Sequence, residues 1–326
     1  MPFEDDSTAE ARAPRPRWLR IAGRVLGVAL VALSLFYLGI NLLRGLEQVP
    51  VRSLRPSVGP LVASLGLTVL CVALGGWNWR LLLMALGYQV PLRRCVAIQA
   101  TSNLAKYVPG YAWQLLGKGY LTRREGVPTA AAAYAVLLEM GVLWLTGVAL
   151  ALVAWPAGLE LPVIGVLGRA TQLAAAGVAW ALVALLPLIA RWLGSTGWRW
   201  LAPVPRPAAL WKALGVQVAS WLLFGVAFGC LVGAFQPLKP TDWALSVFSL
   251  VASFVVSLVA VFVPAGLGVR EGVMAATLGA RLAGGLPVVV ALLSRVVLTA
   301  SELAAWALAR LWLLLARDKG SITQTG

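Results

Sequence analysis

Histidine is absent from this chain of 326 residues. Catalytic Ser–His and Cys–His pairs and zinc sites built on histidine are therefore excluded. The three cysteines, Cys71, Cys95 and Cys230, form no CxxC motif, so they are interpreted as small apolar side chains and not as metal ligands or redox partners. The chain also lacks a Walker loop and a dinucleotide fingerprint, which predicts no ATP hydrolysis and no cofactor.

Charged residues are scarce as well. They make up 12% of the chain, whereas 60% of the residues are hydrophobic and the mean hydropathy is +0.85. Repeated apolar runs exceed the roughly 18 residues that a spanning helix needs, so we expect an all-α polytopic membrane protein with about eight transmembrane helices. The predicted spans are residues 25–43, 58–78, 128–153, 170–190, 211–235, 243–263, 269–284 and 286–314.

The distribution of lysine and arginine predicts the orientation of the chain. Most basic loops fall on one side of the membrane, so both termini of this multi-pass protein are expected in the cytoplasm. The even number of crossings that this requires makes residues 269–284 a broken crossing helix. The predicted domains are a disordered cytoplasmic N-terminus (1–20), a transmembrane domain (21–316) and a cytoplasmic tail (317–326).

The net charge of +15 is compatible with two kinds of partner. Nucleic acid is one, but the basic residues are spread over the predicted cytoplasmic loops, as membrane topology demands. Such loops also attract anionic lipid headgroups. We therefore expect membrane lipids, anionic or phosphate-bearing, as partners and no nucleic acid.

A first polar interruption of the apolar pattern covers residues 103–119. Pro109 removes a backbone donor and Gly110 allows a tight reversal, which is typical of a re-entrant hairpin. The alternative is a kinked amphipathic surface helix over residues 95–121. Irregular backbone at membrane depth is tolerated where it lines a wet cavity, so this break is a candidate substrate-binding site. Its candidate residues are Asn103, Lys106, Pro109, Gly110 and Lys118.

A second interruption covers residues 263–272. A proline and two glycines end the preceding span, and Arg270 and Glu271 open the next helix. A helix N-terminus that carries an arginine is well suited to bind a phosphate. The alternative is an internal ion pair that neutralises buried charge. The candidate binding residues here are Pro264, Gly266, Gly268, Arg270 and Glu271.

Ionisable residues also lie inside predicted spans, where they are costly and tend to mark substrate pathways. Glu139 lies in the third span, and Arg295 and Glu302 share one face of the last span. Glu139 and Arg295 are therefore added to the candidate site. One arrangement pairs Arg295 with a carboxylate and leaves Arg270 or Lys106 for a ligand, but the sequence does not select among the pairings.

The two breaks have a similar layout. Each has a long apolar span, Val-Pro followed closely by Gly, a short helical piece and then another span. Interrupted segments at corresponding positions of two halves indicate a transporter site at a repeat interface. The sequence thus predicts a membrane core with pseudo-symmetric halves.

The motifs at the two breaks resemble those of a known family. From residue 20 onward the chain is similar to the transmembrane region of lysylphosphatidylglycerol synthases and its stand-alone flippase-like relatives. In the bacterial multiple peptide resistance factor, this region is associated with moving aminoacylated phosphatidylglycerol across the cytoplasmic membrane. The resemblance therefore implies that residues 21–316 form a flippase-like domain with a similar lipid-handling core, in the bacterial inner membrane. The residues that carry the resemblance are Asn103-Leu-Ala-Lys-Tyr-Val-Pro-Gly, Lys118, Arg123-Arg124-Glu125-Gly126, Pro264-Ala-Gly-Leu-Gly-Val-Arg-Glu271 and Arg295.

Two differences from the family pattern affect the expected function. The sequence ends at Gly326, soon after the last predicted span, so we expect no soluble aminoacyl-transfer domain and no aminoacylation. Many relatives have a glutamate soon after the first Pro-Gly, where this chain has Trp113 and Gln114. Stand-alone relatives have been linked to hopanoids and polyprenyl-linked sugars as well as to phospholipids, so the resemblance leaves the lipid open.

Three functions are compared on this basis. The leading hypothesis is translocation or binding of a membrane lipid, a phospholipid or a lipid-linked headgroup, across the cytoplasmic membrane without ATP hydrolysis. The alternative is a membrane accessory subunit that presents a lipid or polyprenyl-linked sugar to a separate synthase or glycosyltransferase. An intramembrane enzyme is disfavoured, because the sequence has no histidine, no paired aspartates and no metal-binding cluster.

Overall fold

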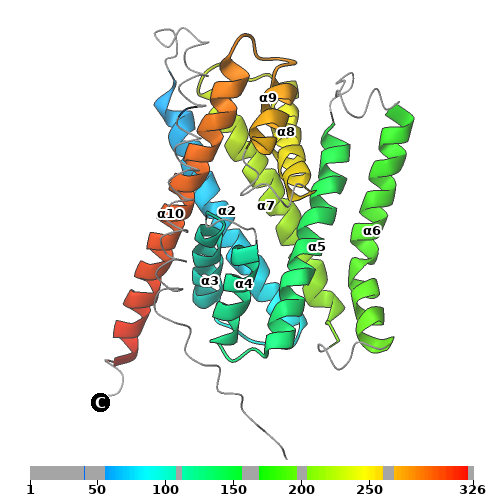
Figure 1. Cartoon of the computed structure of the whole chain (residues 1–326), viewed down its shortest axis with the longest axis vertical. Coiled ribbons are helices and arrows are strands. Elements are labelled where there is room, and N and C mark those ends of the chain that lie inside the picture. The colour runs from blue at the N-terminus through cyan, green and yellow to red at the C-terminus, as the bar shows by residue number, and fades with distance from the viewer. Residues whose placement is uncertain are drawn as a thin grey trace, which may run out of the picture.

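The computed structural model describes residues 40, 56–107, 112–155, 169–196, 204–259 and 268–321. Within these ranges the regular structure is helical, without strands, which confirms the all-α class (Figure 1). The helices are α2 (Val58–Ala85), α3 (Leu92–Ala105), α4 (Ala112–Arg123), α5 (Thr129–Ala154), α6 (Arg169–Thr196), α7 (Pro207–Gly233), α8 (Pro240–Val259), α9 (Val269–Leu278) and α10 (Leu286–Ser321).

Six of these helices are long and apolar enough to cross a membrane, namely α2, α5, α6, α7, α8 and α10. They match six of the predicted spans, and the chain is a multi-pass membrane protein. The predicted span at 25–43 lies outside the described residues apart from Ile40. The predicted total of about eight transmembrane helices therefore stays a prediction.

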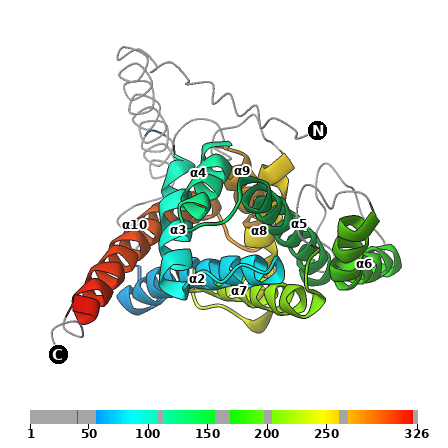
Figure 2. The ribbon, with the colours of Figure 1, turned by 90° about the horizontal axis from the view of Figure 1, so that it is seen from below.

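Helices α2 and α7 lie side by side and run antiparallel (Figure 2). At one end the backbone N–H of Ser57 donates to the carbonyl of Ala234 at 2.7 Å. At the other end the backbone N–H of Arg206 donates to the carbonyl of Ala85, also at 2.7 Å. Because each contact joins the start of one helix to the end of the other, the pair is in contact along its whole length.

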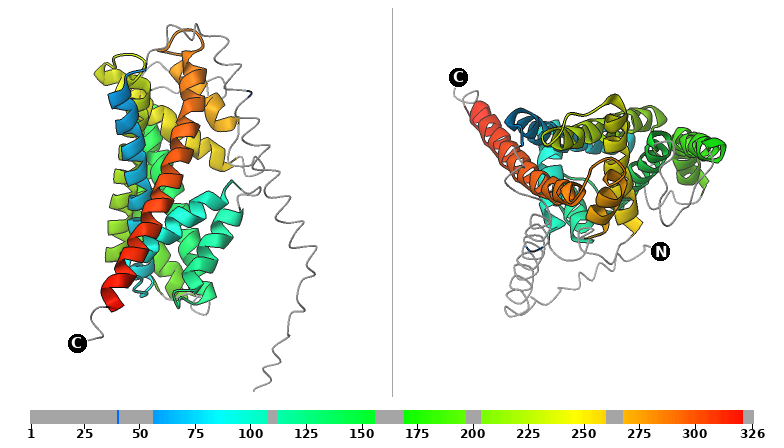
Figure 3. Two further views of the ribbon diagram at one scale, coloured as in Figure 1. Left: turned by 90° about the vertical axis from the view of Figure 1, so that its left-hand side faces the viewer. Right: turned by 90° about the horizontal axis from the view of Figure 1, so that it is seen from above.

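Two pairs of neighbouring helices lie toward opposite ends of the molecule. Helices α3 and α4 lie in the lower half of the left view of Figure 3, and α8 and α9 lie in its upper half. The segment 95–121 is therefore a pair of packed helices and not one kinked helix.

Helix α9 has ten residues and is about 15 Å long, half the roughly 30 Å of a membrane core. Helix α9 is not among the helices long enough to cross a membrane, so the predicted crossing at 269–284 is not confirmed.

The helices form two halves with the same arrangement. In each half a long helix is followed by two helices that pack together and then by another long helix, α2–α5 in the first half and α7–α10 in the second. Contacts between elements correspond as well: α3 packs against α2, α4 and α10, and its counterpart α8 packs against α7, α9 and α5. Because α2 and α7 run in opposite directions, the halves are inverted, as in many membrane transport proteins. Helix α6 lies outside both halves, beside α5 (Figure 2).

Two glycines allow equivalent close approaches in the two halves. A Cβ atom at Gly76 of α2 would lie 2.5 Å from Val96 Cα of α3. A Cβ atom at Gly225 of α7 would lie 2.9 Å from Val247 Cα of α8. Small residues let helix backbones approach closely. Helix α3 therefore crosses α2 at Gly76, and α8 crosses α7 at Gly225.

Two clusters of buried apolar side chains lie toward opposite ends of the molecule. One includes Trp79, Leu82 and Leu210, from the end of α2 and the start of α7. The other includes Phe248 and Met274 and joins the end of α7 to α8, α9 and the start of α10. Between the two clusters the helices carry polar and charged side chains that face a cavity.

Candidate functional site

A cavity of about 220 Å³ lies between the two pairs of shorter helices, and every helix of the two halves contributes to its walls. The end of α3 and the start of α4 contribute Lys106 and Gln114. The end of α8 and the start of α9 contribute Ser257 and Arg270. The two sequence breaks therefore flank one common cavity.

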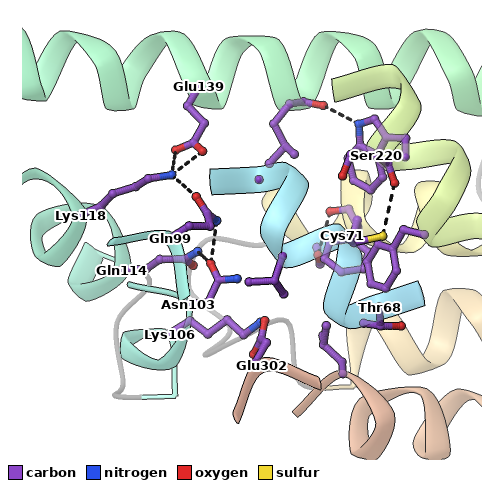
Figure 4. Close-up of a pocket in the computed structure, with 18 of the residues that line it drawn as sticks. Thr68, Cys71, Gln99, Asn103, Lys106, Gln114, Lys118, Glu139, Ser220 and Glu302 are labelled. Carbon is purple, nitrogen blue, oxygen red and sulfur yellow. Dashed lines mark hydrogen bonds and ion pairs between the residues drawn. The ribbon is translucent and has the colours of Figure 1, made fainter. Parts of the chain in front are cut away.

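Lys118 of α4 is the centre of a buried hydrogen-bond network on one wall of the cavity (Figure 4). Its Nζ donates to the two carboxylate oxygens of Glu139 at 2.5 and 2.6 Å and to Gln99 Oε1 at 2.5 Å. Gln99 donates in turn to Asn103 Oδ1 at 3.0 Å, and Gln114 donates to the same oxygen at 3.3 Å. The side chains of Lys118 and Glu139 are only 3% and 10% exposed, so their charges depend on each other for compensation.

Glu302 of α10 organises a second network. It forms an ion pair with Lys106 and accepts a hydrogen bond from the Tyr107 hydroxyl at 2.9 Å (Figure 4 shows the Lys106 pair). The Tyr107 hydroxyl also lies 2.8 Å from Thr299 Oγ1. Lys106 and Tyr107 directly follow α3, so these contacts with α10 fix the end of α3 across the interface between the halves.

Glu271 stabilises the start of α9. Its Oε2 accepts a hydrogen bond from the backbone N–H of Gly268 at 2.7 Å, and its Oε1 pairs with Arg295 Nε at 2.6 Å. Gly268 has a φ of 82°, a left-handed conformation that glycine adopts without strain. The internal ion pair considered from the sequence is therefore formed by Glu271 and Arg295.

Arg270 differs from the other cations of the cavity. Its side chain is buried, with 7% of the residue exposed, and its guanidinium carbon lies 3.6 Å from the ring centroid of Phe254. Its Nε has no hydrogen-bond partner, and among the described residues it makes no ion pair. The cation–π contact stabilises the charge but supplies no acceptor for the planar donors of the guanidinium. Arg270 is therefore able to bind an anion.

Positive charge exceeds negative charge in the described part of the cavity. Three ion pairs each join one cation to one carboxylate, and Arg270 is the further cation. A buried cation without a compensating anion is unfavourable. An anionic group that entered the cavity would therefore be stabilised there. The three pairs are Lys106–Glu302, Lys118–Glu139 and Arg295–Glu271.

The structure brings many of the predicted site residues together. Gly268 and Glu271 lie at the start of α9 but are not among the residues that line the cavity. Pro109, Gly110 and 264–266, which includes Pro264 and Gly266, lie outside the described residues. The predicted residues that line the cavity are Asn103, Lys106, Lys118, Glu139, Arg270 and Arg295.

Several residues that line the cavity do not belong to the site predicted from the sequence. Gln217 of α7 lines the cavity and accepts a hydrogen bond from Asn78 of α2 at 2.9 Å. A lone amide in an apolar span is a usable signal, because polar groups in a membrane are costly unless paired. Glu302 carries the same signal. The aromatic lining residues Trp221 and Phe254 carry none, since such residues are common in apolar helices.

Comparison with known protein families matches residues 24–305 to the lysylphosphatidylglycerol synthase TM region. The matched range includes both halves up to the middle of α10 and all the ion pairs of the cavity. A search of curated proteins found no match. The family match agrees with the resemblance of the two sequence breaks. The chain belongs to the family of the lysylphosphatidylglycerol synthase transmembrane region.

Proposed function

We propose that the protein binds the headgroup of a membrane lipid in this cavity and moves it across the cytoplasmic membrane without ATP hydrolysis. The family suggests a role with membrane lipids. The observation that carries the proposal is the buried guanidinium of Arg270, which faces a cavity lined by both apolar and polar side chains between two inverted halves. A phosphate is the lipid group that this guanidinium suits best.

The short helices support a site at membrane depth. Helices α3 and α4 have 14 and 12 residues, so each is about 18–21 Å long and shorter than the roughly 30 Å of a membrane core. We propose that α3–α4 and α8–α9 are re-entrant pairs that enter from opposite faces of the membrane. Helix ends inside the membrane are tolerated where they line a wet cavity, and such ends form the substrate sites of many transporters.

The size of the cavity supports a headgroup as the occupant. Its volume of about 220 Å³ lies below the roughly 300–1,000 Å³ of pockets that enclose a drug-sized ligand. A whole lipid with its acyl chains therefore exceeds the space. In the proposed mechanism the headgroup passes through the cavity while the acyl chains stay in the bilayer.

Reconstitution tests this proposal directly. The purified full chain is inserted into vesicles that contain phosphatidylglycerol with a fluorescent acyl chain, and a membrane-impermeant quencher is added. Movement between leaflets should expose label that remains protected in protein-free vesicles. Protection equal to that of protein-free vesicles for every lipid tested would overturn translocation. Saturable lipid binding without movement would instead favour the alternative, a subunit that presents a lipid to a separate enzyme.

A further inference from the structure

The charges of the cavity also indicate the chemical class of the headgroup. We infer that the site selects an anionic phosphate headgroup with an uncharged, hydroxyl-bearing part over a cationic, lysyl-modified headgroup. This inference rests on the proposed lipid-handling function. It departs from the lysylated lipid in the name of the family.

The carboxylates of the cavity are already engaged. Glu139 pairs with Lys118, Glu302 pairs with Lys106, and Glu271 pairs with Arg295. An ammonium group that entered the cavity would have to compete with one of these cations. The displaced lysine or arginine would then remain buried without its partner, which is strongly unfavourable. A lysyl headgroup carries two such ammonium groups and therefore fits the cavity poorly.

Arg270 provides the opposite preference. It is the second residue of α9, so its side chain lies next to the positive end of the helix dipole. Its guanidinium makes no ion pair with any carboxylate that the structure describes. A phosphate at this position would receive two parallel hydrogen bonds and would neutralise the excess charge of the cavity. Binding of one monoanionic phosphodiester thus completes the charge balance.

Amide side chains suit the uncharged part of the headgroup. Gln99, Asn103 and Gln114 lie together on the wall around Lys118 (Figure 4), and Gln217 lines the cavity from α7. Among the described residues, Asn103 Nδ2 and Gln114 Oε1 have no hydrogen-bond partner. A free amide donor beside a free amide acceptor matches the hydroxyl groups of a glycerol or sugar. These amides also carry no charge that would attract an ammonium group.

A headgroup series with identical labelled acyl chains tests the selectivity in vesicles that contain the full chain. The probes are phosphatidylglycerol, phosphatidic acid, phosphatidylcholine and lysyl-phosphatidylglycerol. We expect phosphatidylglycerol to move about tenfold faster than the lysyl lipid, with phosphatidic acid slower than phosphatidylglycerol because it lacks the hydroxyl groups. Arg270→Gln should abolish the preference for phosphatidylglycerol over phosphatidylcholine. The exposed Arg281 follows α9, and Arg281→Gln should preserve it.

A charge-addition variant makes the test independent of loss of folding. Gln114→Glu adds a carboxylate to the cavity wall and cancels the excess positive charge, so it should raise the movement of lysyl-phosphatidylglycerol about tenfold over the unmodified protein. Gln114→Met removes the same amide without adding charge and should produce no such gain. A gain in both variants would show that charge is not the selective property and would contradict the inference.

The outcomes separate the inference from the function on which it rests. Equal or faster movement of lysyl-phosphatidylglycerol relative to phosphatidylglycerol would overturn the anionic selectivity and leave lipid movement standing. Absence of movement for the whole series would overturn the proposed function itself. Uptake of glycerol phosphate from solution, without lipid movement, would assign the phosphate site to a water-soluble anion and would overturn both.

Discussion

Two buried cations show how different roles arise from the same kind of charge. Lys118 is compensated by Glu139 at 2.5 Å, whereas Arg270 rests on the ring of Phe254 without a carboxylate partner in the described structure. Replacing Arg270 therefore leaves no carboxylate of the described structure without its partner, whereas replacing Glu139 leaves the buried Lys118 without one. Stability and ligand binding are thus expected to depend on different residues of one cavity.

The Lys118–Glu139 pair gives a prediction at the residue scale. Glu139→Gln should lower the free energy of unfolding by about 3–5 kcal/mol, because it leaves the Lys118 ammonium buried without its partner. Lys118→Met in the Glu139→Gln background should recover much of this loss. Thermal unfolding of the purified protein in detergent, followed as a double-mutant cycle, checks the prediction. A double variant no more stable than Glu139→Gln alone would show that the pair does not set the stability here.

Each half of the molecule depends on one helix that crosses its long helix closely. In the first half α3 meets α2 at Gly76, and in the second half α8 meets α7 at Gly225. The crossing places the end of α3 and the end of α8 on opposite sides of the cavity. Gly76 and Gly225 therefore help to position the helices that form the cavity, although neither glycine lines it.

At the element scale we predict opposite effects for two classes of glycine. Gly76→Ala and Gly225→Ala should destabilise by about 1–3 kcal/mol, because the added carbon meets the backbone of the crossing helix. Gly66→Ala in α2 and Gly215→Ala in α7 have no atom within 4 Å of the added carbon. These two changes should stabilise by up to about 1 kcal/mol through helix propensity. Melting temperatures in detergent measure both classes, and equal effects would contradict the close crossings.

The elements also show which parts of the structure can be predicted from sequence. Hydropathy predicts the long apolar helices, and polar residues close in sequence to the proline–glycine clusters, such as Lys106 and Arg270, line the cavity as predicted. The sequence alone does not show where α9 ends within the apolar run 269–284, because this depends on how the helix packs against α8 and α10. The sequence does not predict which buried cation pairs with which carboxylate, for a different reason. Lys106 and Glu302 lie 196 residues apart in the chain, so their contact depends on how the two halves pack.

At the scale of the whole molecule, the inverted halves determine how the chain crosses the membrane. Helices α2, α5, α6, α7 and α10 run between the two ends of the molecule, whereas α3–α4 and α8–α9 each return to the end where they begin (Figures 1 and 3). Together with the predicted span at 25–43, these five helices would make six crossings, an even number. We therefore propose that both termini face the cytoplasm, in agreement with the distribution of basic residues.

Cysteine labelling tests this topology. Arg206 precedes α7 and Lys239 precedes α8, so the two exposed residues lie at opposite ends of the same long helix. In a variant without the three native cysteines, an impermeant thiol reagent on intact cells should label Lys239→Cys. Arg206→Cys should react after the cells are opened. Labelling of Arg206→Cys from outside, with Lys239→Cys protected, would reverse the proposed orientation.

The central claim is that Arg270 binds the phosphate of a lipid headgroup during movement across the membrane. Its most direct test is the rate of phosphatidylglycerol movement in vesicles with equal amounts of the unmodified protein, Arg270→Lys, Arg270→Gln and Arg281→Gln. Loss of bidentate geometry in Arg270→Lys should slow movement about tenfold, Arg270→Gln should slow it further, and Arg281→Gln should match the unmodified protein. Folded yield should be equal in all four, since Arg270 has no carboxylate partner in the described structure. Unchanged movement in Arg270→Gln would contradict the account.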